Sequence, residues 1–152
     1  MESVTKSINV NVPVRVAYDQ WTQFEEFPKF MEAVQEVQQL DDKRLHWRAE
    51  IGGKQTEWDA EITEQVPDQR IAWTSTDGAP NDGVVAFRSL GPDSTEVTLQ
   101  MGYEPQSATE KIGNSLGFVD RQVEGDLRRF KEFVEQRGFP TGGWRGSIEE
   151  HP

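Results

Sequence analysis

The residues that could perform acid–base or metal chemistry are few, and their spacing places them on a solvated surface. His46 is the only histidine away from the C-terminus. A two-residue turn at Gly52-Gly53 would set His46 opposite Asp59 in a hairpin. The same register pairs further residues of opposite charge on that face, namely Arg44 with Glu61 and Arg48 with Glu57. The pattern predicts a structural role for His46 rather than a catalytic or metal-binding one.

Motifs for nucleophilic, phosphate or zinc chemistry are absent from the sequence. There is no phosphate loop, nucleophile elbow or HExxH motif, and no cysteine to act as a nucleophile or a thiolate ligand. Glu57, Asp59 and Glu61 alternate with apolar residues, so period two places all three on the charged face rather than in a carboxylate site. His151 lies next to the C-terminus. We therefore expect no metal ion and no cofactor.

The overall charge narrows the choice of partners. A net charge of −11 disfavours nucleic acid and anionic membranes, because an acidic surface repels both. No apolar run approaches the length of a membrane-spanning helix, and the start of the chain has no signal-peptide pattern. The lack of cysteine agrees with a reducing compartment. We expect a cytoplasmic protein with no nucleic-acid partner and no integral membrane segment, and its oligomeric state stays open.

The length fits one domain over residues 1–138, followed by a tail at residues 139–152. At 152 residues the chain can bury a core or give part of that core to an internal cavity. The tail is rich in glycine and acidic residues, and we expect it to be loosely ordered except where Trp144 docks.

Most of the chain alternates between apolar and polar residues at the period of β-strands. The first expected strand covers residues 4–12, and Pro13 then opens a short helix that carries Val14, Ala17, Trp21 and Phe24. A second helical turn ends in an aromatic corner at residues 27–31. Six further strands are expected near residues 34–41, 44–53, 55–66, 70–77, 83–91 and 95–104. Their short connections favour antiparallel hairpins, and so a meander.

Residues 107–137 predict one long amphipathic helix. Seven apolar residues recur along it at helical spacing: Ile112, Leu116, Val119, Val123, Leu127, Phe130 and Val134. A capping box that begins at Ser107 marks the start of the helix, and Gly138 marks its end. Gly113 and Gly117 flank the apolar stripe. They fit either a bend with close packing against the sheet or a hinge that opens over a cavity.

The polar side of this helix interleaves basic and acidic residues near its end. The basic residues are Arg128, Arg129 and Lys131, and the acidic ones are Glu124, Asp126, Glu132 and Glu135. Such alternation is typical of a solvated, salt-bridged face rather than of a basic patch for an anionic partner.

The sheet face that the helix covers is rich in large apolar side chains. Six of them alternate inward: Trp47, Trp58, Trp73, Phe87, Met101 and Tyr103. Leu116, Val119 and Val123 would close the space from the helix. These nine are our candidate ligand-binding residues, and the pattern fits both a packed core and the wall of a pocket. Tyr103 is the expected polar handle, since its hydroxyl needs a partner when buried.

Several segments together resemble a known family. They are EWDAEITE from Glu57 to Glu64, Pro67, Arg70 to Trp73, Gly83 to Phe87, the FPKFM corner from Phe27 to Met31, and DLRRFK from Asp126 to Lys131. Over roughly residues 3–137 the chain resembles the polyketide cyclase/dehydrase family of the START-related, birch-pollen-allergen-like superfamily, including its coenzyme Q-binding-like members. The resemblance implies an α+β helix-grip fold: a seven-stranded curved antiparallel sheet wrapped around a long C-terminal helix, with two short helices after strand 1. It also implies an enclosed apolar cavity.

The resemblance leads to three hypotheses, because members of the superfamily bind lipids, sterols, quinones, polyketides or plant hormones and only some cyclise polyketides. The first is binding or carriage of a small hydrophobic ligand that is lipid, quinone or polyketide-like. The second is an aromatase/cyclase-type enzyme in which Tyr103, with Thr56 or Ser75, guides proton transfer. The third is a protein-interaction module that uses the outside of the sheet or helix. No catalytic set of the family matches this chain residue by residue.

Overall fold

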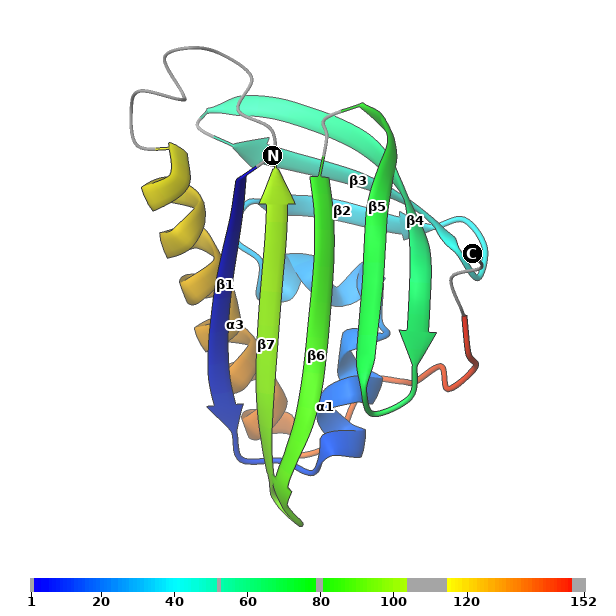
Figure 1. Cartoon of the computed structure of the whole chain (residues 1–152), viewed down its shortest axis with the longest axis vertical. Coiled ribbons are helices and arrows are strands. Elements are labelled where there is room, and N and C mark those ends of the chain that lie inside the picture. Colours follow the sequence, from blue (N-terminus) through cyan, green and yellow to red (C-terminus); the bar gives the residue numbers. More distant parts are fainter. Residues whose placement is uncertain (1, 52, 79–80, 104–114, 149–152) are drawn as a thin grey trace.

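The computed structural model describes residues 2–51, 53–78, 81–103 and 115–148 (Figure 1). The elements follow in the expected order, with a strand, two short helices, six strands and a long helix. The strands are β1 (Glu2–Val10), β2 (Val34–Gln39), β3 (Arg44–Ile51), β4 (Lys54–Val66), β5 (Arg70–Gly78), β6 (Asn81–Gly91) and β7 (Ser94–Tyr103). The helices are α1 (Val14–Trp21), the 3-10 helix η1 (Phe24–Lys29) and α3 (Ser115–Arg137).

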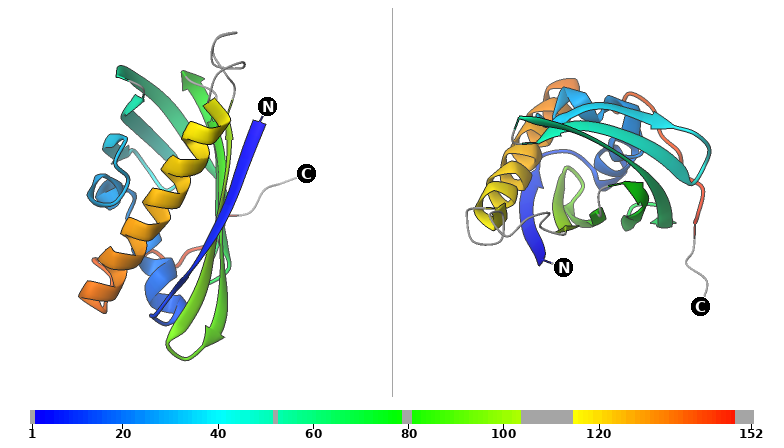
Figure 2. Two further views of the ribbon diagram at one scale, coloured as in Figure 1. Left: turned by 90° about the vertical axis from the view of Figure 1, so that its left-hand side faces the viewer. Right: turned by 90° about the horizontal axis from the view of Figure 1, so that it is seen from above.

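The strands form one antiparallel sheet in the order β1-β7-β6-β5-β4-β3-β2. Strands β2 to β7 make a meander, because each is joined to the next by a short turn, and β1 returns to pair with β7. Figure 2 shows that the sheet is strongly bent and that α3 lies across its open side. The predicted α+β fold, a curved seven-stranded sheet with a long C-terminal helix, is confirmed.

The hairpin between β3 and β4 has the predicted register. Trp47 pairs with Trp58, and His46 pairs with Asp59. Gly53 has a φ of 81°, a conformation that glycine adopts without steric cost. Because side chains alternate along a strand, this register sends the two tryptophans to the inner face of the sheet and the charged residues to the outer face.

The outer face of β3 and β4 is charged as predicted, although its ion pairs differ in detail. His46 lies between two carboxylates, with Nδ1 2.6 Å from Asp59 Oδ1 and Nε2 3.0 Å from Glu57 Oε1. The two arginines find other partners than the residues opposite them: Arg48 pairs with Glu36 at 3.7 Å and Arg44 with Asp41 at 2.7 Å. The hydrogen bond to Asp59, and then that to Glu57, raise the pKa of His46 above its ordinary value of 6.5.

The first strand ends at Val10, before the predicted end at residue 12, because the next backbone groups bind side chains. The N–H of Asn11 donates to Glu135 Oε2 at 2.7 Å. The hydroxyl of Thr95 donates to the carbonyl of Val12 at 2.8 Å. These bonds replace the sheet pairing that strand-like alternation alone predicts.

The short helix α1 begins after Pro13 as predicted but ends before Phe24. The hydroxyl of Thr22 donates to the carbonyl of Asp19 at 2.6 Å, which closes the last turn. Phe24 then belongs to η1, a separate 3-10 helix that contains Pro28. The chain therefore turns twice between β1 and β2, and both turns point aromatic side chains into the core.

The helix α3 is described from Ser115 onward, so the predicted first part at residues 107–114, with its capping box and Gly113, lies outside the described residues. The rest of the apolar stripe is buried, as predicted: Val123, Leu127, Phe130 and Val134. Gly138 has a φ of 72°, and its N–H donates to the carbonyl of Val134 at 3.0 Å. This glycine cap confirms the predicted end of the helix.

The polar face of α3 carries the expected salt bridges. They are Arg128–Glu124 at 3.1 Å, Arg129–Asp126 at 2.5 Å and Lys131–Glu135 at 2.5 Å. In the parts of the chain that the structure describes, the helices are too short or too polar to span a membrane.

The segment at residues 139–148, for which the composition predicts loose order, makes several contacts with the rest of the chain. Trp144 packs against the core, as expected, and Ile148 is buried. Arg145 forms ion pairs with Asp19 at 2.6 Å and Asp68 at 2.7 Å. Glycine-rich composition suggests flexibility, but here the segment is fastened by side chains and backbone groups of α1 and β4 that are distant in sequence.

Candidate ligand-binding site

Three tryptophans from neighbouring strands form a stack on the inner face of the sheet. Trp47 on β3, Trp58 on β4 and Trp73 on β5 are all buried. The rings of Trp47 and Trp58 stack with centroids 5.7 Å apart and an interplanar angle of 10°, and those of Trp47 and Trp73 with 6.4 Å and 23°. Trp47 and Trp58 stack because the hairpin sets them directly opposite each other. We call this group the tryptophan wall.

A glycine makes room for the third ring of this wall. Gly83 on β6 pairs with Trp73 on β5. A Cβ atom built on Gly83 would overlap the indole of Trp73, so the ring lies directly against the backbone of β6. The sequence marks Gly83 only as part of a strand, and the need for glycine becomes visible once the register is known.

The wall contains polar groups without a protein partner. The indole Nε1 atoms of Trp47 and Trp58 are buried and form no hydrogen bond with any of the described residues. An indole N–H can only donate, so each of these groups is suited to an acceptor oxygen. A buried donor without an acceptor costs about 1–3 kcal/mol, which a bound carbonyl or hydroxyl oxygen would recover.

The other predicted site residues lie in different places. Met101 pairs with Gly83 and is partly buried beside the wall. Phe87 is buried farther along β6, where the centroid of its ring lies 5.5 Å from that of Tyr18 and 6.4 Å from that of Trp21. Val123 is buried on α3. The side chains of Tyr103, Leu116 and Val119 lie outside the described residues, so their place in the site stays a prediction.

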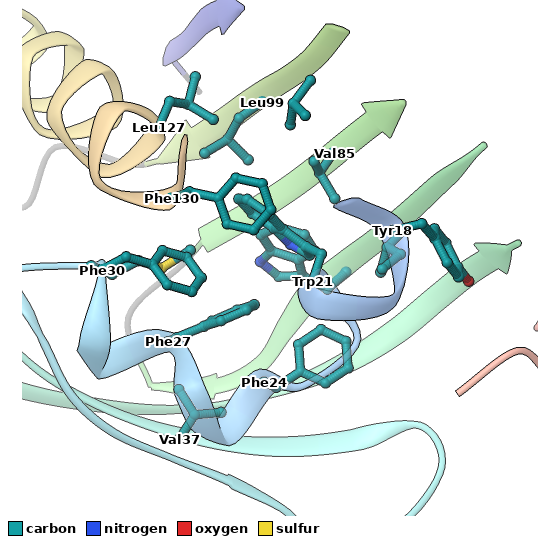
Figure 3. Close-up of a cluster of buried hydrophobic side chains, with 14 of the residues drawn as sticks. Tyr18, Trp21, Phe24, Phe27, Phe30, Val37, Val85, Leu99, Leu127 and Phe130 are labelled. Carbon is teal, nitrogen blue, oxygen red and sulfur yellow. The ribbon is translucent and has the colours of Figure 1, made fainter. Parts of the chain in front are cut away.

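The core around Trp21 is a second group of aromatic rings, and it touches the wall where Phe27 packs against Trp47 with centroids 5.4 Å apart. Trp21 is fully buried, with ring centroids 4.8 Å from Phe130 and 5.6 Å from Phe27. Phe30 contacts Phe130 with centroids 5.2 Å apart. Figure 3 shows these rings from α1, η1 and α3 converging on one point. We call this group the Trp21 core, and it fills its part of the interior with protein.

Two hydroxyl groups share the face of the tryptophan wall. Thr56 lies two residues before Trp58 on β4, and Ser75 two residues after Trp73 on β5, so strand alternation places both on the inner face. Both residues are half-buried. They are the hydroxyls that the enzyme hypothesis named with Tyr103.

Charged groups in the described interior have structural partners. Burial raises the pKa of Asp126, while hydrogen bonds from Arg129 and Gln122 partly offset this effect. Arg129 also donates to the carbonyl of Phe30 at 2.8 Å, which ties α3 to η1. Within residues 2–51, 53–78, 81–103 and 115–148 there is no group of three or more histidine, aspartate or glutamate side chains that could hold a metal ion.

A surface groove of about 370 Å³ lies between β1 and α3, away from the tryptophan wall. Its lining is mostly polar and charged: Lys6, Ser7, Ile8, Glu124, Leu127 and Arg128. Lys6 closes one side through an ion pair with Asp120 at 3.1 Å. Because an apolar molecule gains little in such a groove, we place the candidate site at the wall instead.

Comparison with protein-family models decides the family. Residues 10–132 match the family described as polyketide cyclase/dehydrase and lipid transport. The chain belongs to this family. The resemblance inferred from the sequence is therefore confirmed, and the match covers every strand of the sheet except most of β1.

The chain is similar in sequence to one curated protein and in fold to many solved structures. A 17.2 kDa protein from the melC2-rnhH intergenic region of Streptomyces lincolnensis, described as uncharacterized, is 54% identical over 97% of this chain and 99% of its own. The Zhui aromatase/cyclase from Streptomyces sp. R1128 superposes with a TM-score of 0.79 at 14% identity, covering 94% of this chain and 99% of its own. A START superfamily protein from Mycobacterium smegmatis superposes with a TM-score of 0.71 at 17% identity, covering 89% of this chain and 95% of its own.

Proposed function

We propose that this protein binds or carries a small hydrophobic molecule between the sheet and α3, against the tryptophan wall. The observation that carries the proposal is the stack of Trp47 and Trp58 with two buried N–H groups that have no acceptor among the described residues. Apolar walls with a few convergent polar groups are typical of ligand sites. The family description, which includes lipid transport, supports the same function.

The chemistry of the wall favours a ligand that is apolar over most of its length and carries an acceptor oxygen. The stacked indoles are apolar along their ring edges, and their N–H groups donate to a carbonyl or hydroxyl oxygen. A quinone, a polyketide-like ketone and a lipid carbonyl all meet this requirement. We further propose that the protein works in the cytoplasm, where a chain without cysteine needs no oxidising compartment.

The proposal is tested by native mass spectrometry of gently purified protein, followed by titration with a naphthoquinone, a fatty acid and an aromatic polyketone. We expect uptake of at least one of these probes with quenching of tryptophan fluorescence. Trp47→Phe and Trp58→Phe keep a ring but remove the N–H donor, and each should weaken binding about tenfold, the worth of one hydrogen bond.

Trp73→Phe is the matched control, because Trp73 contributes a ring to the wall but no buried unpartnered N–H among the described residues. It should weaken binding less than the other two variants. Equal losses in all three variants would show that the N–H groups are not the contacts. No uptake of any probe would reject the binding function.

A second candidate function is polyketide cyclisation or aromatisation. It is favoured by Thr56 and Ser75, whose hydroxyls share the face of the wall, and by the fold of the Zhui aromatase/cyclase. In this case the wall would hold a folded poly-β-keto chain while Tyr103 and these hydroxyls guide proton transfer. Turnover of a poly-β-keto thioester that falls in Tyr103→Phe would support the enzyme. Cyclisation no faster than in buffer would reject it.

A further inference from the structure

The segment at residues 139–148 leaves the end of α3, passes α1 and reaches β4 (Figure 1). We call it the C-terminal strap. It lies beyond residue 132, where the match to the family model ends. Its contacts with the rest of the chain indicate its role.

Two buried polar side chains of the α1 region hold the first half of the strap. The N–H of Thr141 donates to Gln20 Oε1 at 2.8 Å, and Gln20 Nε2 donates back to the hydroxyl of Thr141 at 3.1 Å. The N–H of Trp144 donates to the hydroxyl of Thr22 at 3.1 Å. Gln20 and Thr22 are almost fully buried, so the strap supplies partners for polar groups that the apolar core cannot satisfy.

Arg145 joins the strap to two further elements. Its guanidinium donates to Asp19 Oδ1 on α1 at 2.6 Å and to Asp68 Oδ2 in the turn between β4 and β5 at 2.7 Å. Its Cζ also lies 5.5 Å from the centre of the Tyr18 ring. One side chain thus ties α1 to the sheet through two carboxylates and an aromatic face.

The end of the strap pairs with the edge of β4 that faces away from β5, beyond the last residue that β3 covers. Strand β3 pairs with β4 only as far as Glu61, so the edge near Gln65 is open on that side. Gln65 N–H donates to the carbonyl of Ile148 at 2.7 Å, and Ile148 N–H donates back at 2.9 Å. The strap therefore ends as a short antiparallel addition to the sheet.

The strap approaches α1 closely at Gly143, where a larger residue would press on Asp19. A Cβ atom on Gly143 would lie 2.9 Å from Asp19 Cγ, and one on Gly142 would lie 2.7 Å from Gln23 Oε1. The glycines that make the sequence look like a flexible tail thus allow the strap to pack closely against its neighbours.

The surface of α1 and β4 that the strap covers is polar, unlike the rest of the interior. Tyr18 Oη, Gln65 Nε2 and Asp68 Oδ1 are buried; Asp68 Oδ1 forms no hydrogen bond with the described residues, and Tyr18 and Gln65 have at most each other as partners. Figure 3 shows the Tyr18 hydroxyl pointing away from the rings of the Trp21 core. Water would satisfy all three groups if the strap left, so its release costs less than opening an apolar contact of the same size.

We propose that the C-terminal strap is a releasable latch on α1, which opens without unfolding the sheet. Closed, it holds α1 through Asp19, Gln20 and Thr22. Open, it frees the helix whose Tyr18 and Trp21 pack against Phe87 and Phe130. The latch thereby controls how tightly one side of the apolar interior is closed. This inference does not depend on the identity of any ligand.

Hydrogen exchange followed by mass spectrometry on the full chain tests the latch. Arg145→Gln removes both ion pairs, and Gly143→Ala pushes the strap from Asp19 without changing charge. In each variant, amides of the strap and of α1 should exchange at least tenfold faster, while those of β5 and β6 keep their rates. The matched controls are Arg128→Gln, which breaks an exposed ion pair on α3, and Gly91→Ala, whose Cβ would meet nothing within 4 Å.

Two results would overturn the proposal. Unchanged exchange in α1 in both variants would show that the strap does not hold the helix. Equal acceleration in α1, β5 and β6 would show that the strap opens only when the whole molecule unfolds. Because the readout needs no ligand, these results are separate from the success or failure of the binding assays above.

Discussion

The Trp21 core and the tryptophan wall are both aromatic, but their rings are arranged differently. In the core, rings from α1, η1 and α3 meet at steep angles, as for Trp21 and Phe130 with an interplanar angle of 66°. In the wall, rings on adjacent strands lie nearly parallel, as for Trp47 and Trp58 at 10°. Around Trp21 the rings approach from several elements, whereas the parallel rings of the wall stand on one sheet. The two regions touch where Phe27 of η1 packs against Trp47, with ring centroids 5.4 Å apart.

The two regions can also be compared by their buried indole N–H groups. A buried indole N–H without a partner among the described residues occurs in both regions, at Trp21 as well as at Trp47 and Trp58. The donor alone therefore does not separate core from site. The packing of the rings differs, because Trp21 contacts phenyl rings from η1, β6 and α3, whereas Trp47 stacks on two other indoles and contacts one phenyl ring, that of Phe27.

The largest expected effect separates the two regions by stability. Trp21→Ala should lower the free energy of unfolding by about 4 kcal/mol, because it empties a fully packed site. Trp58→Ala should cost about 3 kcal/mol, the lower end of the range for buried tryptophans, because the ring contacts for Trp58 are to Trp47 rather than to rings from several elements. Urea unfolding followed by circular dichroism measures both. Equal losses would mean that the wall is packed as tightly as the core.

The next effect concerns the glycine under the wall. Gly83→Ala should lower the free energy of unfolding by about 2 kcal/mol, because the new methyl group displaces the Trp73 ring. Tryptophan fluorescence should shift in the same variant. Gly91→Ala on the same strand is the control and should change stability by less than about 0.5 kcal/mol. A neutral Gly83→Ala would show that Trp73 does not lie against β6.

A smaller effect should come from the outer face and depend on pH. The pKa of His46 is raised in the folded state, so its bonds to Asp59 and Glu57 stabilise the fold fully below pH 6.5. This contribution is lost as the pH rises through the folded-state pKa. The stability difference between the native chain and His46→Gln should thus shrink from about 0.5 kcal/mol toward zero. Unfolding curves from pH 5 to 9 measure it, and a difference that grows with pH would contradict it.

The smallest effect is expected on the exposed side of α3. Arg128→Gln removes an ion pair with Glu124 whose two side chains are mostly in solvent, and it should cost about 0.3 kcal/mol. The loss should vanish in 1 M salt, where the pair is screened. A cost above about 1 kcal/mol would show that Arg128 stabilises the interior, which we otherwise attribute to aromatic packing.

Local patterns in the sequence predicted most of the fold. Alternation and short turns predict the meander, and the Gly-Gly hairpin predicts that Trp47 faces Trp58. Helical spacing predicts the buried stripe of α3 from Val123 to Val134. These predictions succeed because each depends on residues that are near in sequence or joined by a tight turn.

The candidate site was predicted only in part. Trp47, Trp58 and Trp73 lie together, but Phe87 belongs with Tyr18 and Trp21, because α1 covers that stretch of β6. The spacing of apolar residues along β6 does not predict where α1 lies. Tyr103, Leu116 and Val119 remain predictions, since their side chains lie outside the described residues.

The sequence by itself determined the order of elements, the register of the central hairpin and the family, because periodicity, turn residues and short motifs are local properties of the chain. Only the tertiary structure decided which aromatic rings surround Trp21 and which stack in the wall, and which distant residues the glycine-rich segment contacts. Both depend on contacts between residues far apart in sequence, such as Arg145 with Asp19 and Trp73 with Gly83. Pattern alone cannot show such contacts, because it records the face that a side chain occupies but not its neighbours on that face.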